Sequence, residues 1–180
     1  MELENSKNIE ISKTYLKNGY VIKDIKNKDS LSWITNEFIK IVSKILKIKE
    51  KKNHLDIFNY IHKHVKIKDL NKFRLDIYNK INKNNKFKLH YYNLAKEYLD
   101  VLVGNELVMQ SRVNLSIQYP NDSSSLLPIH ADTWSGVSPY EIVVWLPLVD
   151  CYKTKSMYYM KSNKIHLINK LFKNKKLSPK

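Results

Sequence analysis

A histidine and an aspartate one residue apart, His130 and Asp132, are the side chains of this sequence best suited to bind a metal ion. At positions i and i+2 of an extended segment, the imidazole and the carboxylate would point to the same side of the chain. They supply two of the three ligands of the 2-His-1-carboxylate facial triad, which leaves open positions on Fe(II) for other molecules. The pair alone is not specific, because 6 histidines and 9 aspartates in 180 residues give about 0.3 such pairs by chance.

The residues on both sides of this pair show the patterns of β-strands. Residues 112–119 alternate between polar and apolar side chains, which predicts a half-buried strand. Pro120 and the polar residues after it end this strand with turn chemistry. Residues 141–149, EIVVWLPLV, predict a buried strand, in which Pro147 indicates an edge position or a bulge. We therefore expect a strand, a loop that carries His-x-Asp, and a second strand.

The run NLSIQYPNDSSSLLPIHADTWSG, followed by SPYEIVVWLPLVDCYKTKSM, resembles the sporadic carbohydrate cluster family of 2-oxoglutarate- and Fe(II)-dependent oxygenases. The resemblance is dense over residues 100–158 and looser over the part before them. It implies a double-stranded β-helix (jelly-roll) core, in which His130 and Asp132 bind Fe(II) together with a distal histidine. It also implies a dioxygenase that uses 2-oxoglutarate as co-substrate and acts on a carbohydrate-related metabolite, in surface-polysaccharide or unusual-sugar biosynthesis.

The family pattern includes two groups that have no counterpart in this sequence, the distal histidine and a basic residue near it that binds 2-oxoglutarate. A closed jelly roll needs about eight strands, whereas residues 112–180 have room for about three or four. His166 follows His130 by 36 residues, and as the third ligand it would require an abnormally short barrel. The sequence is therefore expected to be an N-terminal portion of such an enzyme, or an enzyme that ends in an unrelated tail.

Three amphipathic helices are predicted in the first half of the chain. Apolar side chains recur with the 3.6-residue period of a helix over residues 30–49, 69–84 and 86–103. Asp29 or Ser30 is expected to cap the first helix, and Gly104 is expected to end the third. Residues 19–22 (GYVI) predict a short strand ahead of the helices.

The predicted fold class is α+β, with N-terminal helices packed on a partial double-stranded β-helix (jelly-roll or cupin-like) core. We expect a single oxygenase-like domain over residues 1–180. Its parts are a mainly helical region over 1–105, the first part of the jelly-roll core over 106–160, and a basic tail over 161–180.

Several polar and aromatic residues are candidates for the surroundings of the metal. Asn114 and Gln118 lie on the polar face of the first predicted strand, where they either hydrogen-bond 2-oxoglutarate or substrate, or face solvent. Trp134 either covers the metal and stacks on a sugar, or packs under its own loop. His62 and His64 would share one side of an extended segment, but with no third ligand nearby we interpret them as surface or substrate-side residues.

The net charge of +15 raises the question of nucleic-acid binding. Of the 32 basic residues, 30 are lysine, and arginine occurs only at Arg74 and Arg112. Surfaces that bind DNA or RNA usually rely on arginine and exposed aromatic side chains, so the composition argues against nucleic acid as a partner. Lysine, asparagine and isoleucine are enriched together, which indicates coding bias. An anionic small-molecule substrate stays compatible with this charge.

The chain carries no pattern of a secreted or membrane-spanning protein. Residues 1–8 are polar and acidic and lack the apolar core of a signal peptide. No run approaches the roughly 18 apolar residues that cross a bilayer. The single cysteine, Cys151, is expected to be a small buried side chain and fits a reducing compartment, so we expect a cytoplasmic protein.

Two functions remain open at this point. The first is the Fe(II)- and 2-oxoglutarate-dependent dioxygenase that the resemblance implies. The second is a catalytically inactive, truncated jelly-roll fragment that binds a partner or oligomerises through exposed sheet edges.

Overall fold

The computed structural model describes residues 2–49, 55–123 and 126–167. The α-helices of these residues are α1 (Glu2–Asn18), α2 (Lys28–Leu46), α3 (Leu55–Phe58), α4 (Leu70–Lys83) and α5 (Asn85–Leu102). Their 3₁₀-helices are η1 (Ile61–Lys63), η2 (Ile67–Asp69), η3 (Asp132–Ser135) and η4 (Ser162–Lys164). Of the helices in this part of the chain, none is long and apolar enough to cross a membrane.

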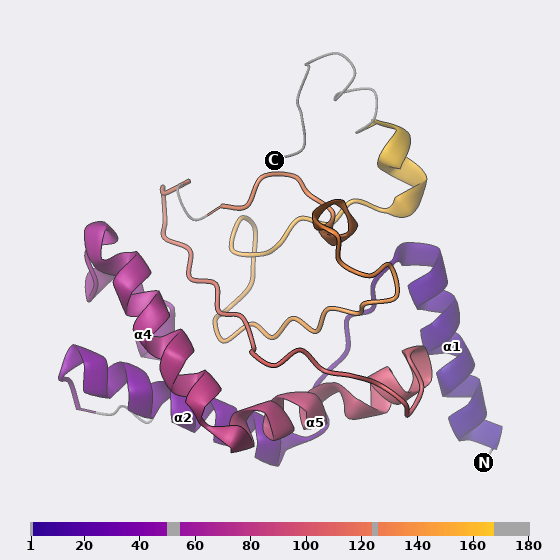
Figure 1. Ribbon diagram of the computed structural model, residues 1–180, viewed down its shortest axis with the longest axis horizontal. Coiled ribbons are helices and arrows are strands. Elements are labelled where there is room, and N and C mark those ends of the chain that lie inside the picture. Colours follow the sequence, from indigo (N-terminus) through magenta and orange to yellow (C-terminus); the bar gives the residue numbers. More distant parts are fainter. Residues whose placement is uncertain (1, 50–54, 124–125, 168–180) are drawn as a thin grey trace.

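The three predicted helices are confirmed as α2, α4 and α5, and they form the centre of the molecule. Helix α2 contacts both α4 and α5, which also contact each other, and α1 packs on α5. Figure 1 shows the chain after α5, in orange and yellow, running between α4 and α1. The predicted cap of α2 is wrong, because Asn27 caps it by accepting a hydrogen bond from the Ser30 N–H. Gly104, with φ +92°, follows the last turn of α5 as predicted.

The core forms where the apolar stripes of α2, α4 and α5 meet. Ile34 and Ile81 are fully buried, and Phe87 and Ile77 are nearly so. The rings of Phe38 and Phe87 meet edge to face, with their centroids 5.7 Å apart. Each such side chain contributes about 1.5–3 kcal/mol when it is removed from water, so these stripes hold the helices together.

Helix α1 was not predicted, and its sequence explains why. Ile11 is its one buried apolar residue among those with described burial, whereas Ile9 and Leu16 are 47% and 81% exposed. With so few apolar side chains on one face, the 3.6-residue period is too weak to recognise. This helix is held by its packing on α5 more than by its own pattern.

The predicted α+β fold with a partial jelly-roll core is wrong, because the residues that the structure describes form no strand and no sheet. In the described residues after 105, the backbone hydrogen bonds outside helices join residues at most five positions apart. The chain there is extended but has no neighbouring strand to pair with. Oligomerisation through sheet edges therefore loses its basis in this part of the chain.

Side chains of residues 112–119 alternate between the helices and solvent, as predicted, but the segment does not form a strand. Val113 is only 5% exposed and lies in the core, while the apolar residues at alternate positions after it pack against the helices. The side chain of Asn82, on α4, accepts a hydrogen bond from the Val113 N–H (2.7 Å) and donates one to the Val113 carbonyl (3.0 Å). A helix side chain thus takes the place of a neighbouring strand for this segment.

Residues 141–149 also alternate, so the prediction of a buried strand is wrong for half of its side chains. Leu146 and Leu148 pack against the core, whereas Val143 and Trp145 are 63% and 48% exposed. The segment is fixed to α5 by the hydroxyl of Tyr91, which donates a hydrogen bond to the Val144 carbonyl (2.7 Å). It is therefore a half-buried extended segment on the helices, without a sheet.

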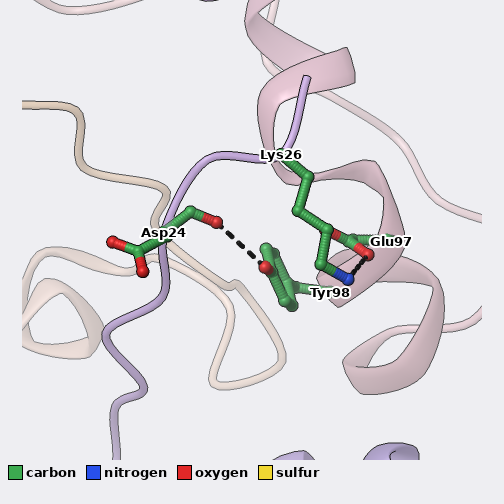
Figure 2. Close-up of polar contacts among 4 residues, drawn as sticks. All are labelled: Asp24, Lys26, Glu97 and Tyr98. Atoms are coloured by element: carbon green, nitrogen blue, oxygen red, sulfur yellow. Dashed lines mark hydrogen bonds and ion pairs between the residues drawn. The ribbon is translucent and has the colours of Figure 1, made fainter. Parts of the chain in front are cut away.

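The connection between α1 and α2 is irregular, and the strand predicted over residues 19–22 is not formed. Figure 2 shows how α5 holds this connection: Lys26 pairs with Glu97, and the Tyr98 hydroxyl donates a hydrogen bond to the Asp24 carbonyl (3.0 Å). Both contacts are exposed, so their contribution to stability is small. They set the path of the chain rather than its stability.

Gly19 ends α1 in the left-handed region, with φ +79°, and lies against the C-terminal half of the chain. A Cβ atom placed on Gly19 would lie 2.3 Å from the hydroxyl oxygen of Tyr159. The Tyr159 ring also meets Tyr20 edge to face, at 5.2 Å between centroids. The end of α1 is thus a docking point for residues near 159, and a side chain at position 19 would displace the Tyr159 hydroxyl.

Replacing Asn82 with alanine should destabilise the fold, because it leaves the Val113 N–H and carbonyl without a partner. We expect a loss of about 1–3 kcal/mol in the free energy of unfolding, measured by denaturant titration. Hydrogen exchange at the Val113 amide should become faster. The matched control is Asn79→Ala at an exposed position of the same helix, where the change should stay within about 0.5 kcal/mol. Equal losses in the two variants would contradict the bridging role of Asn82.

Gly19→Ala should cost more stability than Gly104→Ala. Both glycines have positive φ, which costs an L-residue about 1–2 kcal/mol. Only at Gly19 does the new methyl group also collide with Tyr159, because nothing lies within 4 Å of a Cβ at Gly104. The denaturation midpoints of the two variants measure the difference, and adding Tyr159→Phe to Gly19→Ala should recover part of it. Identical midpoints for the two alanine variants would rule out this docking contact.

Candidate functional site

His130 and Asp132 lie on the same side of the chain, as their spacing predicts. Ala131 between them is extended (φ −124°, ψ 138°), and Asp132 opens the helical turn η3. The Nε2 atom of His130 is 3.7 Å from the Oδ1 atom of Asp132. That distance is too long for a hydrogen bond, but it is shorter than two metal–ligand bonds of about 2.0–2.2 Å laid end to end. One ion can therefore contact both atoms.

The orientation of the His130 ring is fixed by the residue two positions before it. Its Nδ1 atom lies 2.7 Å from the carbonyl oxygen of Pro128. A carbonyl only accepts hydrogen bonds, so Nδ1 carries a proton, and in a neutral imidazole the free electron pair is then on Nε2. Metal-binding histidines commonly donate their other N–H in this way, which selects the tautomer that binds the ion. The ring is thus oriented with Nε2 turned toward Asp132, as metal binding requires.

The donor chemistry fits a divalent metal at two positions, and the third is not supplied by the described residues. Within residues 2–49, 55–123 and 126–167, no three histidine, cysteine, aspartate or glutamate side chains are close enough to hold a metal together. His166 and the His62–His64 pair therefore do not complete the site in this part of the chain. The side chains of His130 and Asp132 are 49% and 56% exposed, so they are open to a donor from elsewhere.

The other predicted site residues lie apart from this pair or beside it. Asn114 and Gln118 are exposed, on the face of residues 112–119 opposite the side chains packed on the helices. Neither is hydrogen-bonded to His130 or Asp132. Trp134 lies in η3, two residues after Asp132, and is 43% exposed. Its backbone N–H donates a hydrogen bond to the Ala131 carbonyl (2.9 Å). Trp134 is therefore the predicted neighbour that shares a structural element with Asp132 in the described residues.

The loop that carries the pair is anchored at both ends by tyrosine hydroxyls. Before it, Tyr119 donates a hydrogen bond to the Val65 carbonyl (2.9 Å). After it, Tyr91 donates to the Val144 carbonyl. Burial raises the pKa of Tyr91 from its ordinary value of 10.0 to about 12, with a backbone contact at Leu146 opposing part of this rise. Both hydroxyls therefore stay protonated, as donors, throughout the neutral range.

The charge of the segment around the pair differs from that of the whole chain. Residues 113–150 contain no lysine or arginine, although the chain has 32 of them. The same segment contains four acidic residues, Asp122, Asp132, Glu141 and Asp150. Fixed cations close to the pair in sequence are thus absent, which favours a divalent cation there over other positions on a basic protein. This local absence of cations is present in the sequence itself, but the net charge of +15 for the whole chain masks it.

Cys151, which follows this segment, does not behave as the sequence predicted. It was expected to be buried, but it is exposed. The partial burial of the thiol nevertheless raises its pKa, and the nearby Lys155 opposes that rise only in part. A nucleophilic cysteine needs a lowered pKa, so this thiol is not activated.

Comparison of the chain with models of protein families, with curated proteins and with solved structures finds no match in any of the three.

Tyr91→Phe should flatten the loss of stability at alkaline pH. Between pH 10 and about 12, Tyr91 ionises in the unfolded chain but not in the folded one. The unfolded state then binds fewer protons, so the stability of the wild type falls as pH rises, by up to about 1.4 kcal/mol per pH unit from this residue. The phenylalanine variant lacks this contribution. Chemical denaturation at several pH values measures the slope.

The matched control for this experiment is Tyr140→Phe, because the Tyr140 side chain is 88% exposed. It should retain the wild-type dependence on pH. A Tyr91→Phe variant with the same slope as the wild type would contradict the burial of this hydroxyl.

Proposed function

We propose that this chain is a relative of the Fe(II)- and 2-oxoglutarate-dependent dioxygenases, in which His130 and Asp132 occupy two positions on the metal. The observation that carries the proposal is the preset geometry of the pair. The His130 Nδ1–H is held by Pro128, and Nε2 faces the Asp132 carboxylate at 3.7 Å. The motif resemblance around PIHADTW supplies the identity of the metal and of the co-substrate. The jelly roll that the resemblance implied is not formed in the described residues, so the support for the proposal is the pair and the motif resemblance.

In this proposal the side chains of the chain bind and orient, and the metal supplies the chemistry. When bound, Fe(II) and 2-oxoglutarate would activate O2, which is the oxidant of the substrate C–H bond, while 2-oxoglutarate would be converted to succinate and CO2. His130 offers a neutral imidazole nitrogen, and Asp132 offers a carboxylate that offsets part of the charge of the ion. Trp134, in η3 and 43% exposed, is the aromatic side chain beside Asp132 that we assign to contact with a sugar ring.

The proposed substrate is a small carbohydrate-related metabolite, and the proposed location is the cytoplasm. The resemblance supports the substrate class, and the net charge of +15 is compatible with an anionic substrate such as a nucleotide sugar. The single cysteine supports a reducing compartment. Asn114 and Gln118, which are exposed, remain candidates for contacts with 2-oxoglutarate or substrate.

The second candidate function is that of a non-catalytic binding module. It is favoured by the third metal position, which no described residue fills. It is also favoured by large apolar side chains that are more than half exposed in the described residues after 125, among them Leu127, Ile129 and Tyr158. Such side chains are commonly covered by a partner in proteins that act by binding.

Metal binding tests the site assignment directly. The full chain should bind Co²⁺, a spectroscopic substitute for Fe(II), and both His130→Ala and Asp132→Ala should weaken that binding. Because loss of a group that merely orients a ligand costs about 10–100-fold in metal affinity, loss of a ligand should cost at least that much. Titration followed by visible absorption measures it. His64→Ala, at another exposed histidine, is the control and should bind as the wild type does. Unchanged affinity in His130→Ala would remove the pair from the site.

Turnover separates the two candidate functions. With Fe(II), 2-oxoglutarate and O2, the dioxygenase function predicts that the full chain forms succinate and CO2 and that His130→Ala does not. Metal binding without succinate would favour the binding module instead.

A further inference from the structure

We propose that a divalent metal ion links two copies of this chain, with His130 and Asp132 of each copy as its ligands. The inference rests on the proposed function only in requiring that the pair binds a metal. It answers the question that the site leaves open, namely which groups complete the coordination of an ion that the described residues hold at two positions.

The geometry of the pair allows a second copy to approach. The two side chains are 49% and 56% exposed, and the donor atoms Nε2 and Oδ1 lie on one side of the chain. Two copies related by a two-fold axis bring the same patch together, so each contributes the same donors. Two imidazoles and two carboxylates make four ligands, which is the number that Zn²⁺ takes in a closed protein site. A single copy offers half of that set.

The ring orientation makes the linked site specific. Because the Pro128 carbonyl holds the His130 Nδ1–H, the Nε2 electron pair already points toward the Asp132 side. Little rotational freedom of the imidazole is then lost when a metal binds, which favours binding over that of an unrestrained surface histidine.

The charge of the surrounding segment removes an obstacle to self-association. With a net charge of +15, two copies repel each other in most orientations. Residues 113–150 contain no lysine or arginine. When this segment of one copy contacts the same segment of the other copy, no two positive side chains are therefore brought together. The carboxylates of two Asp132 side chains would repel each other without the ion and are neutralised with it. Association through this segment should therefore depend on metal.

Apolar side chains next to the pair can contribute to the contact. Leu127 and Ile129 are 76% and 67% exposed, and Trp134 is 43% exposed. They precede and follow the pair within a few residues, so a two-fold axis at the metal would bring them near their counterparts. Covering such side chains contributes about 25 cal/mol per Å² of apolar surface. The metal would thus fix the position of an interface that these side chains then cover.

Sedimentation velocity of the full chain with and without Zn²⁺ tests this inference. We expect a monomer in the presence of EDTA and a dimer with Zn²⁺, at a stoichiometry of one ion per two chains. His130→Ala and Asp132→Ala should each abolish the metal-dependent dimer. His64→Ala is the matched control and should dimerise as the wild type does. Co²⁺ should give the strong visible absorption of a four-coordinate ion in the dimer, and the same two substitutions should remove it.

The outcomes separate this inference from the proposed function. One ion bound per monomer, with no dimer, would overturn the inference and leave the metal site of the proposed function intact. A metal-dependent dimer that persists in His130→Ala would also overturn it, because other side chains would then link the copies. Absence of any metal binding in the wild type would overturn both. A metal-linked dimer that forms no succinate would support the inference and count against the dioxygenase function.

Discussion

The burial of one apolar stripe from each of α2, α4 and α5 is the interaction on which the rest of this structure depends. Residues after 105 form no sheet of their own in the part that the structure describes, so they must take their positions from the helices. They do so through apolar side chains that enter the core and through helix side chains that pair with their backbone. Asn82 and Tyr91 are examples of such side chains. Loss of the helical core would therefore also release the loop that carries His130 and Asp132.

Local pattern predicted the helices and the direction of side chains, but it did not predict what the extended segments pair with. The period of α2, α4 and α5 is strong because each buries a full stripe, whereas α1 buries little and was missed. Alternation in residues 112–119 correctly indicated which side chains face inward. The same alternation suits a strand in a sheet and an extended segment lying on helices. The difference lies in long-range contacts such as Asn82 with Val113, which no local pattern contains.

The candidate site divides in the same way. Spacing predicted that His130 and Asp132 share a side, because a two-residue step in extended chain allows little else. The tautomer of His130 depends on the Pro128 carbonyl. A third ligand of the proposed metal site would depend on groups distant in sequence, and the described residues supply none. Neither follows from spacing. Residues 113–150 contain no lysine or arginine, which can be read directly from the sequence. This absence of nearby positive charge independently favours a cation at the proposed site.

The hydrogen bond from His130 to Pro128 ties the orientation of the ring to the backbone of its own loop. The acceptor is a main-chain carbonyl only two positions before the histidine, so the ring keeps its direction only while residues 128–130 keep their conformation. Asp132, by contrast, is positioned by the turn η3 that it opens. A change in either stretch of backbone would therefore separate the Nε2 and Oδ1 atoms, although neither side chain itself had been altered.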